Sequence, residues 1–232
     1  MRILVTRAQE DAERTAERLE GLGHETIIAP VLQIVPTGDP APDVACDALI
    51  VTSAHAMEAL SAFANKGMRV FSVGERTSDV LRAGGFTSIE TAEGDAVSLS
   101  ALIRNTLPPT STLLHVTARH HKEEPAASLR ALGFTVHTWE GYEARALETL
   151  PEAAMEALRT GKIGAVLHYS RRSAELFIQL ADKAELRSAI LGCPHLCLSA
   201  DVAAPLDAIG AATRIAGAPH EDALLELARG HS

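Results

Sequence analysis

The sequence predicts an α/β protein of two similar lobes, each a parallel sheet flanked by helices, joined by a two-stranded connector. Strand-like and helix-like segments alternate along the 232 residues. Hydrophobic residues make up 47% and aromatic residues only 3%, so the cores must consist of aliphatic side chains, which suits helices packed on parallel sheets. Two motifs also recur, Val5-Thr6-Arg7 near positions 116–119 and the 48–53 pattern at 165–170. Because solenoid units span only roughly 20–50 residues, this longer repeat indicates two globular lobes with a cleft.

The opening of the chain has the pattern of one βαβ unit. A strand is expected over 3–6, a helix over 11–22 with Ala12, Ala16 and Leu19 on one face, and a strand over 25–29 after Gly23. Proline and glycine between 36 and 42 predict a connector. The next expected elements are a strand at 48–52, a helix at 54–64, a strand at 70–73, a helix at 77–83, a short strand at 88–89 and a helix at 96–105.

The second half repeats this order after Pro108-Pro109. We expect a strand over 112–116, a helix over 124–132 and a strand over 135–139. The polar, weakly periodic stretch 140–150 predicts a second connector. The remaining expected elements are a strand at 165–169, a helix at 173–182, a strand at 195–199, a helix at 202–209, a strand at 213–216 and a helix at 221–229.

The breaks in pattern are strongest at 37–42 and 140–145, not at the repeat boundary near Pro108. We therefore expect an exchanged arrangement in which the first βαβ unit joins the C-terminal segment. The first lobe is expected to comprise residues 1–35 and 146–232, and the second lobe residues 36–145. Two crossing strands would link them.

The composition excludes several classes of partner and cofactor. The net charge of −9 argues against nucleic acid and anionic membranes, which need an extended basic face, but it permits a small anionic ligand. The sequence contains neither a GxxxxGK[ST] loop nor a GxGxxG turn after a strand, so no nucleotide cofactor is expected. The motifs GxSxG and HExxH are also missing, which argues against a serine hydrolase and a zinc protease. We expect no cofactor and no metal.

The three cysteines, Cys46, Cys193 and Cys197, are expected to be reduced, buried thiols. Their number is odd, and Cys193 and Cys197 lack a second pair of ligands for zinc. The chain starts directly with a strand pattern and has no run of roughly 18 apolar residues. A monomer in the cytoplasm is expected.

Small polar residues follow the strands at the carboxyl ends, where parallel sheets bind ligands and helices present free N–H groups. Taken singly, each Ser or Thr is explained more simply as an N-cap than as a ligand contact. Five such turns facing one cleft favour anion binding: Thr6-Arg7, Thr52-Ser53-Ala54, Gly74-Glu75-Arg76-Thr77, Tyr169-Ser170-Arg171-Arg172-Ser173 and Ser199-Ala200-Asp201.

Tyr142 lies in the expected second connector, at the mouth of the cleft. Its phenol suits donation of a proton or a hydrogen bond to a leaving hydroxyl, although it is a weak acid unless perturbed. The alternative, a ring that merely packs on the linker, is equally compatible with this position.

The order and spacing of several motifs resemble the uroporphyrinogen-III synthase family over nearly the whole chain. The resemblance rests on Val5-Thr6-Arg7, Gly23-His24 followed by Ala29-Pro30, Thr52-Ser53, Val73-Gly74-Glu75-Arg76-Thr77, Tyr142-Glu143, Tyr169-Ser170 and the segment 216–227. It implies two α/β lobes, no cofactor, and a linear hydroxymethylbilane substrate with eight carboxylates. In this family the substrate hydroxyl leaves, the last pyrrole ring is inverted through a spiro intermediate, and the ring closes with loss of water.

The resemblance also implies roles for individual residues. Tyr142 matches the tyrosine proposed to assist departure of the hydroxyl, and Ser53, Thr77 and Ser170 match hydroxyl residues that line the cleft. Arg7 is a further candidate for a substrate carboxylate.

Three positions depart from the pattern of this family: Ala8 replaces a frequent proline, Val202 a threonine, and Ser199 a glycine. The hydroxyl contact at Val202 is thereby lost, while Ser199 adds a hydroxyl to the expected substrate site. A non-catalytic two-lobed protein that binds an anionic metabolite is the alternative function.

Overall fold

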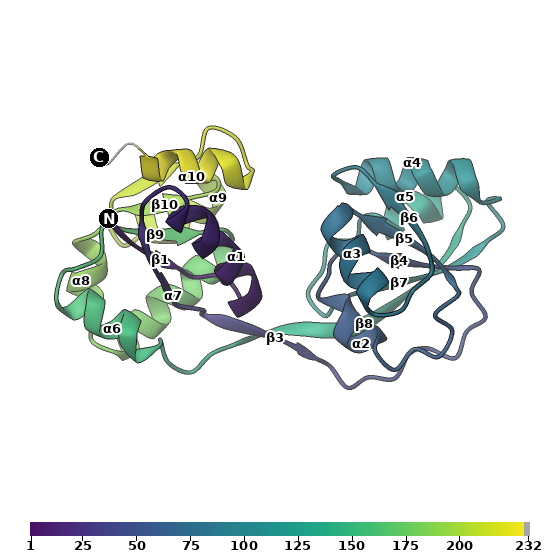
Figure 1. Ribbon diagram of the computed structural model, residues 1–232, viewed down its shortest axis with the longest axis horizontal. Helices are drawn as coiled ribbons and strands as arrows, with labels where there is room; N and C mark the ends of the chain where they lie inside the picture. The colour runs from purple at the N-terminus through teal and green to yellow at the C-terminus, as the bar shows by residue number, and fades with distance from the viewer. Residues whose placement is uncertain (230–232) are drawn as a thin grey trace. The chain divides into compact units, whose positions relative to one another are not determined.

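The computed structural model describes residues 1–229, and the chain divides into two compact units. Unit 1 comprises Met1–Gln33 and Arg145–Ser232, and unit 2 comprises Ile34–Ala144. In Figure 1 the purple N-terminal ribbon shares unit 1 with green and yellow ribbon from the C-terminal third. The sequence places the breaks after residues 35 and 145, whereas the units divide after residues 33 and 144.

Unit 1 is built on a parallel five-stranded sheet in the order β11-β10-β9-β1-β2. The first strand, β1, lies between β2, the next strand in the sequence, and β9, which belongs to the second half of the chain. The strands are β1 (Arg2–Val5), β2 (Glu25–Ile28), β9 (Ala165–His168), β10 (His195–Cys197) and β11 (Thr213–Ile215).

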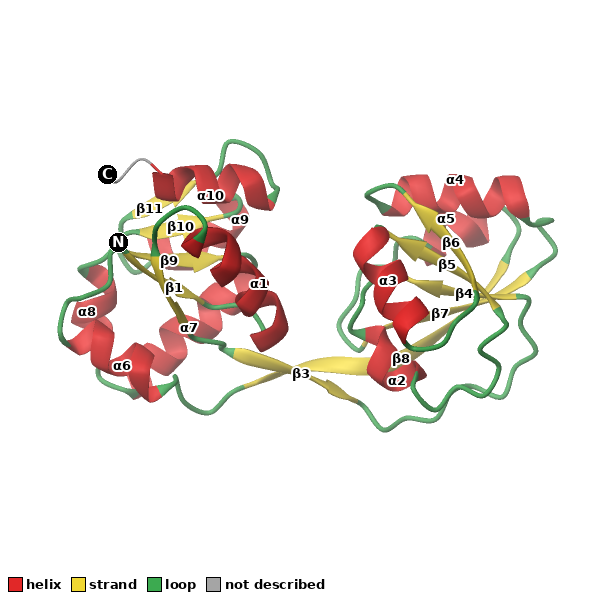
Figure 2. Ribbon diagram, viewed as in Figure 1, coloured by secondary structure: helices red, strands yellow, loops and turns green. Residues whose placement is uncertain are grey.

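Helices cover both faces of this sheet (Figure 2). Because side chains alternate along a strand, Ile3 and Val5 pack beneath one helix layer and Leu4 beneath the other. The first layer consists of α1 (Gln9–Glu20) and α10 (Glu221–Arg229). The second consists of α6 (Glu152–Arg159), α7 (Arg171–Lys183), α8 (Arg187–Leu191) and α9 (Ala200–Asp207).

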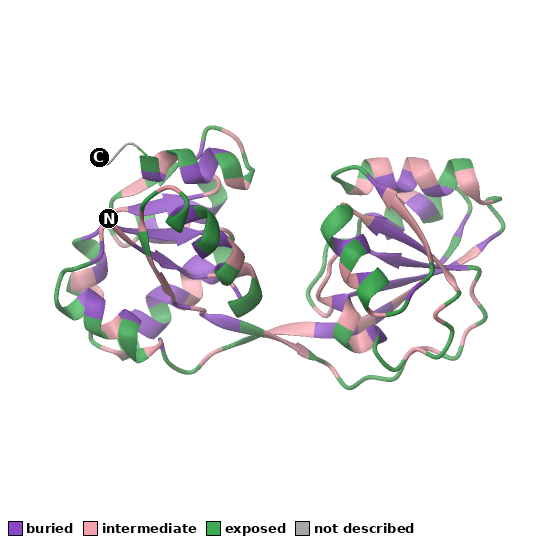
Figure 3. Cartoon of the chain, in the orientation of Figure 1, coloured by how far each residue is buried: buried purple, intermediate pink, exposed green. Residues whose placement is uncertain are grey.

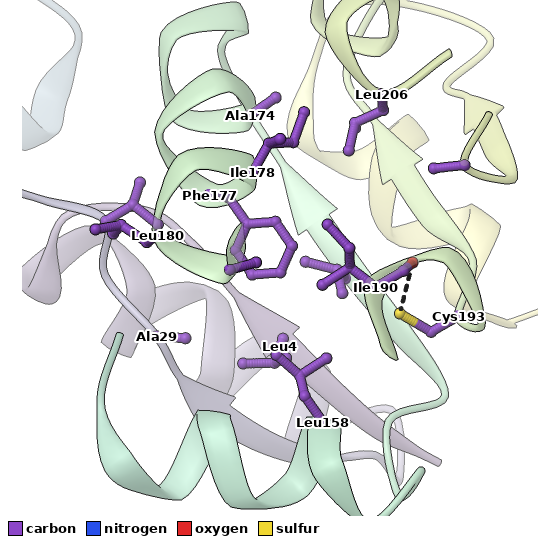
Figure 4. Packing of buried hydrophobic residues seen from close by; sticks show 14 of the residues in the cluster. Leu4, Ala29, Leu158, Ala174, Phe177, Ile178, Leu180, Ile190, Cys193 and Leu206 are labelled. Atoms are coloured by element: carbon purple, nitrogen blue, oxygen red, sulfur yellow. Dashed lines mark hydrogen bonds between the residues drawn. The ribbon is translucent and has the colours of Figure 1, made fainter. Parts of the chain in front are cut away.

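The larger core of unit 1 is centred on the fully buried Phe177 of α7, with Leu4 and Ile190 nearby (Figure 4). A polar pair is enclosed in the same layer. The His168 Nε2 and His195 Nδ1 atoms lie 3.0 Å apart, and the other ring nitrogen of His195 lies 2.8 Å from the carbonyl oxygen of Ile190. These contacts satisfy polar atoms that are expensive to bury unpaired.

Unit 2 is built on a six-stranded sheet in the order β3-β8-β7-β4-β5-β6. All its neighbouring strands from β8 to β6 pair in parallel. The strands are β3 (Leu32–Pro36), β4 (Ala48–Val51), β5 (Arg69–Val73), β6 (Ser88–Ala92), β7 (Thr112–Ala118) and β8 (Thr135–Ala146).

Two helices lie on each face of this sheet. The layer of α4 (Ala96–Thr106) and α5 (Ala126–Ala131) covers Ala48 and Ile50, and the layer of α2 (Ala56–Leu60) and α3 (Glu75–Ala83) covers Leu49 and Val51. Figure 3 shows the central strands of both sheets buried and the helices exposed along one side. The expected fold class, parallel sheets flanked by helices, is confirmed.

The chain passes between the units in β3 and β8. The Thr37 N–H donates to the Gly141 carbonyl at 3.1 Å, and the Leu147 N–H donates to the Val31 carbonyl at 3.0 Å, so the two segments run antiparallel. Two crossing strands were expected between the lobes, and β3 and the end of β8 are these strands. β3 lies at Leu32–Pro36, however, before the stretch 37–42 in which the connector was expected.

Two helices were not expected, α6 and α8. α8 has only 5 residues, too few to show a helical period. α6 buries the stripe of Ala154, Ala157 and Leu158, a short pattern that follows the polar stretch 140–150. That stretch is itself strand as far as Ala146.

The buried side chain of His115, in β7, has polar atoms without hydrogen-bond partners among the residues that the structure describes. His115 is 1% exposed, and both its ring nitrogens lack a hydrogen-bond partner among the residues that the structure describes. Burial, with smaller contributions from His121 and Arg130, lowers its pKa to about 4. The neutral ring is therefore the form in the folded protein at neutral pH.

We predict that His115→Leu stabilises the protein. An apolar side chain of similar volume removes two unpaired polar atoms, each of which costs about 1–3 kcal/mol when buried. The gain should grow as the pH falls from 6.5 towards 4, because the unfolded chain then binds a proton that the folded ring rejects, which costs the native protein up to about 3 kcal/mol.

Urea unfolding of wild type and variant between pH 7.5 and 5 measures this difference. His168 and His195 also have lowered pKa values because they are buried, so the test is the difference between the two proteins rather than the slope of either. A variant less stable than wild type at every pH contradicts the prediction.

Candidate functional site

The carboxyl edge of the sheet in unit 1 gathers three of the residues expected to bind substrate. β1, β9 and β10 are adjacent and parallel, so the residues that follow them emerge at the same edge. Arg7 follows β1, Ser170 follows β9 and Ser199 follows β10.

Ser170 and Ser199 are N-caps of the helices that begin there. The Ser170 hydroxyl accepts from the Ser173 N–H at 3.1 Å, and the Ser199 hydroxyl accepts from the Val202 N–H at 3.4 Å. Each cap uses one of the free donors in the first helical turn and leaves others at the edge of the sheet. Both serines therefore cap helices, and they do so at the sheet edge where a ligand contact was expected.

Arg7 is held by neighbouring side chains. Its guanidinium lies 4.0 Å above the centre of the Tyr169 ring, and its Nη1 donates to Glu221 at 2.9 Å. Its Nη2 lies 3.5 Å from a carboxylate oxygen of Asp11. Arg7 is thus oriented and paired with two carboxylates at this edge.

The corresponding edge of unit 2 carries Ser53 after β4 and Thr77 in the first turn of α3, after β5. α3 has no side-chain cap, and its N-cap position is Gly74, whose φ of 74° places it in the left-handed region that favours glycine. The hydroxyl of Ser78 lies 2.7 Å from those of Ser72 and Thr91, and these contacts fix the first turn of α3 on β5 and β6. The N–H groups of this turn are therefore held at the sheet edge.

Tyr142 reaches the same edge from β8. The ladder between β7 and β8 is regular up to Thr117, and it then shifts by one residue so that Ala118 pairs with Tyr142. Such a bulge redirects the side chain that follows it. The Arg119 N–H donates to the Tyr142 carbonyl at 2.8 Å, which fixes the backbone beyond the bulge.

The bulge depends on Gly141. A Cβ atom at this position would lie 2.8 Å from the Cβ of Ala59 in α2, closer than real contacts allow. Glycine is therefore required because α2 passes so near, not because of its φ.

The phenol of Tyr142 is nearly enclosed, with 6% of the residue exposed. Burial raises its pKa, and a hydrogen bond with Ser53 offsets this in part. The ring of His55 lies 6.3 Å from that of Tyr142, and the His55 N–H donates to the Ser53 hydroxyl at 3.3 Å. Tyr142 therefore keeps its proton at neutral pH, so the phenol is able to donate a hydrogen bond.

The residues expected at the site thus form one group in each unit. Arg7, Ser170 and Ser199 share the carboxyl edge of unit 1, while Ser53, Thr77 and Tyr142 share that of unit 2.

Sequence reasoning missed His55, Glu221 and any role for Tyr169. His55 lies only two residues after Ser53, but an isolated histidine there carries no pattern. Glu221 is separated from Arg7 by 214 residues, and only the fold brings them together.

The cysteines are not candidates for nucleophilic chemistry. All three are free thiols. Burial raises the pKa of Cys193 to about 11 and that of Cys197 to about 12, so neither forms a thiolate at neutral pH. Within residues 1–229 no three His, Cys, Asp or Glu side chains cluster as a metal site would require.

Comparisons with known proteins identify the family to which the sequence is similar. The family model described as uroporphyrinogen-III synthase HemD matches residues 13–226. The comparison with curated protein sequences gives no significant match.

Two crystal structures have a similar fold. Uroporphyrinogen-III synthetase from Helicobacter pylori 26695 matches with a TM-score of 0.68 and 17% identity, covering 100% of both chains. A mutant uroporphyrinogen III synthase from the extremely thermophilic bacterium Thermus thermophilus matches with a TM-score of 0.50 and 18% identity, covering 99% of this chain and 96% of that one. No helix within residues 1–229 is long and apolar enough to cross a bilayer. Since the family model spans nearly the whole sequence, the chain belongs to the uroporphyrinogen-III synthase HemD family.

Proposed function

We propose that this chain is a uroporphyrinogen-III synthase, a lyase that cyclises hydroxymethylbilane with inversion of the last pyrrole ring and loss of water. The observation that carries the proposal is the match of the HemD family model to residues 13–226. A monomer acting in the cytoplasm remains our expectation from the sequence.

The chemistry of the substrate suits the two sheet edges. Hydroxymethylbilane carries eight carboxylates, and the edges offer Ser170, Ser199, Ser53 and Thr77 together with the first-turn N–H groups of the helices that begin there. Backbone donors at helix N-termini bind carboxylates without adding a full positive charge. A polyanion is then held by many modest contacts, which favours release of an equally charged product.

We assign Tyr142 the role of assisting departure of the hydroxyl. Its phenol stays protonated because burial raises its pKa, so it donates a hydrogen bond to the hydroxyl oxygen as the carbon–oxygen bond breaks. The phenol proton passes to the departing hydroxyl, which leaves as water, and the electrophilic carbon is attacked by the substituted carbon of the last pyrrole. The proton that this pyrrole ring loses when the macrocycle closes returns to the phenolate. The hydrogen bond with Ser53 orients the phenol for this step.

Folding of the substrate is the larger task of the protein. The linear tetrapyrrole closes spontaneously without ring inversion, so catalysis of the inverted product depends on holding one reactive geometry. Contacts with the carboxylates far from the reacting carbon supply the energy for this.

The function is tested by supplying freshly prepared hydroxymethylbilane and separating the type I and type III products after oxidation. We expect the type III isomer in excess over the protein-free reaction. If the reaction gives type I product alone, at the spontaneous rate, the enzymatic function is contradicted. The alternative, a non-catalytic binding protein, then stands.

We predict that Tyr142→Phe lowers kcat about 100-fold, at the low end of the usual contribution of one proton donor, with a smaller change in KM. Ser53→Ala keeps the phenol but removes the hydroxyl that orients it, so its loss in kcat should be smaller. Steady-state kinetics with type III product as the readout measures both. A Tyr142→Phe variant with wild-type kcat removes the assigned role.

We predict that Ser170→Asp weakens substrate binding without destabilising α7. Aspartate caps a helix as well as serine and interacts favourably with the helix dipole, so the stability should change by less than about 0.5 kcal/mol. Its charge opposes a carboxylate ligand, and KM should rise severalfold.

Ser188→Asp is the matched control for Ser170→Asp, because it adds the same charge in the first turn of α8, away from the sheet edge. Its KM should equal that of wild type. Equal KM values for both variants would exclude Ser170 from the substrate site.

A further inference from the structure

The carboxylate of Glu221, at the start of α10, is surrounded by donors from three other elements. Its Oε1 accepts from the Arg7 guanidinium at 2.9 Å, the Thr15 hydroxyl at 2.8 Å and the Tyr169 hydroxyl at 2.7 Å. Its Oε2 accepts from Arg18 at 2.7 Å. Four donors on one carboxylate are more than an ordinary ion pair between two helices requires.

Three of these donors, on Arg7, Thr15 and Tyr169, are also held by contacts that do not involve Glu221. The Arg7 guanidinium lies over the Tyr169 ring, and its Nη2 atom is also paired with Asp11. The hydroxyls of Thr15 and Tyr169 are 3.4 Å apart, and Thr15 lies 3.3 Å from the Arg7 Nη1. The four groups therefore form a cradle with the shape and polarity of a carboxylate-binding site.

The occupant of this cradle is bound as an anion and is reachable from solvent. Burial alone would raise the pKa of Glu221, but the hydrogen bonds from Tyr169 and Thr15 and the charges of Arg7 and Arg18 lower it. The Glu221 side chain is 29% exposed. A carboxylate from solution can approach the same donors from that side.

Removal of Glu221 from the cradle does not require α10 to move. The helix is anchored by Ala223, Leu224, Leu225 and Ala228, which are all buried against the sheet. The Glu221 side chain rotates about its own bonds, and its place at the start of α10 gives it open solvent on one side.

We propose that Arg7, Thr15, Arg18 and Tyr169 form a carboxylate-binding site, that Glu221 occupies it as an internal stand-in, and that a ligand carboxylate displaces Glu221. The cradle lies at the carboxyl edge of β1 and β9, where Arg7 and Tyr169 follow their strands. The identity of the natural ligand, an acetate or propionate arm of the tetrapyrrole, rests on the proposed function. The site itself does not.

The first experiment uses acetate as the probe and needs no tetrapyrrole. Glu221→Ala should lower the Tm by several degrees, because four donors lose their partner. Sodium acetate at pH 7 should then raise the Tm of this variant by about 3 °C more than sodium chloride of equal ionic strength.

Asp222→Ala is the matched control. Asp222 is the next residue, is exposed and also pairs with Arg18, but it makes none of the contacts with Arg7, Thr15 or Tyr169. Acetate and chloride should affect this variant and the wild type equally. An equal response of all three proteins to acetate and chloride overturns the proposal and leaves Glu221 as a tie between α1 and α10.

Glu221→Gln provides the second test and keeps the shape of the side chain should Glu221→Ala fold poorly. The neutral amide competes less well with a ligand carboxylate, so KM for hydroxymethylbilane should fall severalfold while the type III fraction is retained. A KM equal to or above that of wild type, with type III product still formed, contradicts displacement by substrate. If no protein forms type III product, the proposed function fails, while the acetate experiment still decides the carboxylate site.

Discussion

The pairing of β1 with β9 is the constraint on which the rest of unit 1 depends. β1 has β2 on one side and β9 on the other, so the first strand of the chain is held between its immediate successor and a strand near position 165. The Thr6 hydroxyl donates to the Leu167 carbonyl across 161 residues of sequence, at 2.8 Å and fully buried. The same register brings Arg7 next to Tyr169, and it orders the carboxyl edge from which the helices of the second half begin.

The electrostatics of that edge differ from the net charge of the protein. The chain carries −9 overall, yet the anion sites that we propose consist of oriented N–H groups, hydroxyls and two arginines rather than of a basic surface. Charged groups near the edge are paired with carboxylates, so they are positioned without an excess of positive charge. Such an arrangement distinguishes between anionic ligands by their geometry, because a ligand gains binding energy only where its carboxylates lie opposite the donors.

The sequence predicted the alternation of strands and helices because apolar runs and helical stripes are local. It also predicted which residues follow the strands, since parallel strands expose their carboxyl ends together. Two crossing strands between the lobes were also predicted, but the position of β3 was not, because the prolines and glycine of 36–42 drew the expected connector to the residues that follow it. The Glu221 cradle could not be predicted, since Arg7 and Glu221 meet only when α1 and α10 cover the same face of the sheet. Tyr142 shows the same contrast between local and tertiary features. Its position in a connector was predicted from the sequence, whereas its burial depends on the bulge at Gly141 and on the close approach of α2.

The split of unit 1 also bears on how the polypeptide folds as it leaves the ribosome. Unit 2 is contiguous, from Ile34 to Ala144, and its strands have all been synthesised before β9 is made. The opening β1-α1-β2 segment meanwhile has only one edge of β1 paired, and strands with open edges invite contacts with other chains. During synthesis, β1 therefore precedes the whole of unit 2 but gains its second neighbour, β9, only after the strands of unit 2 have been made.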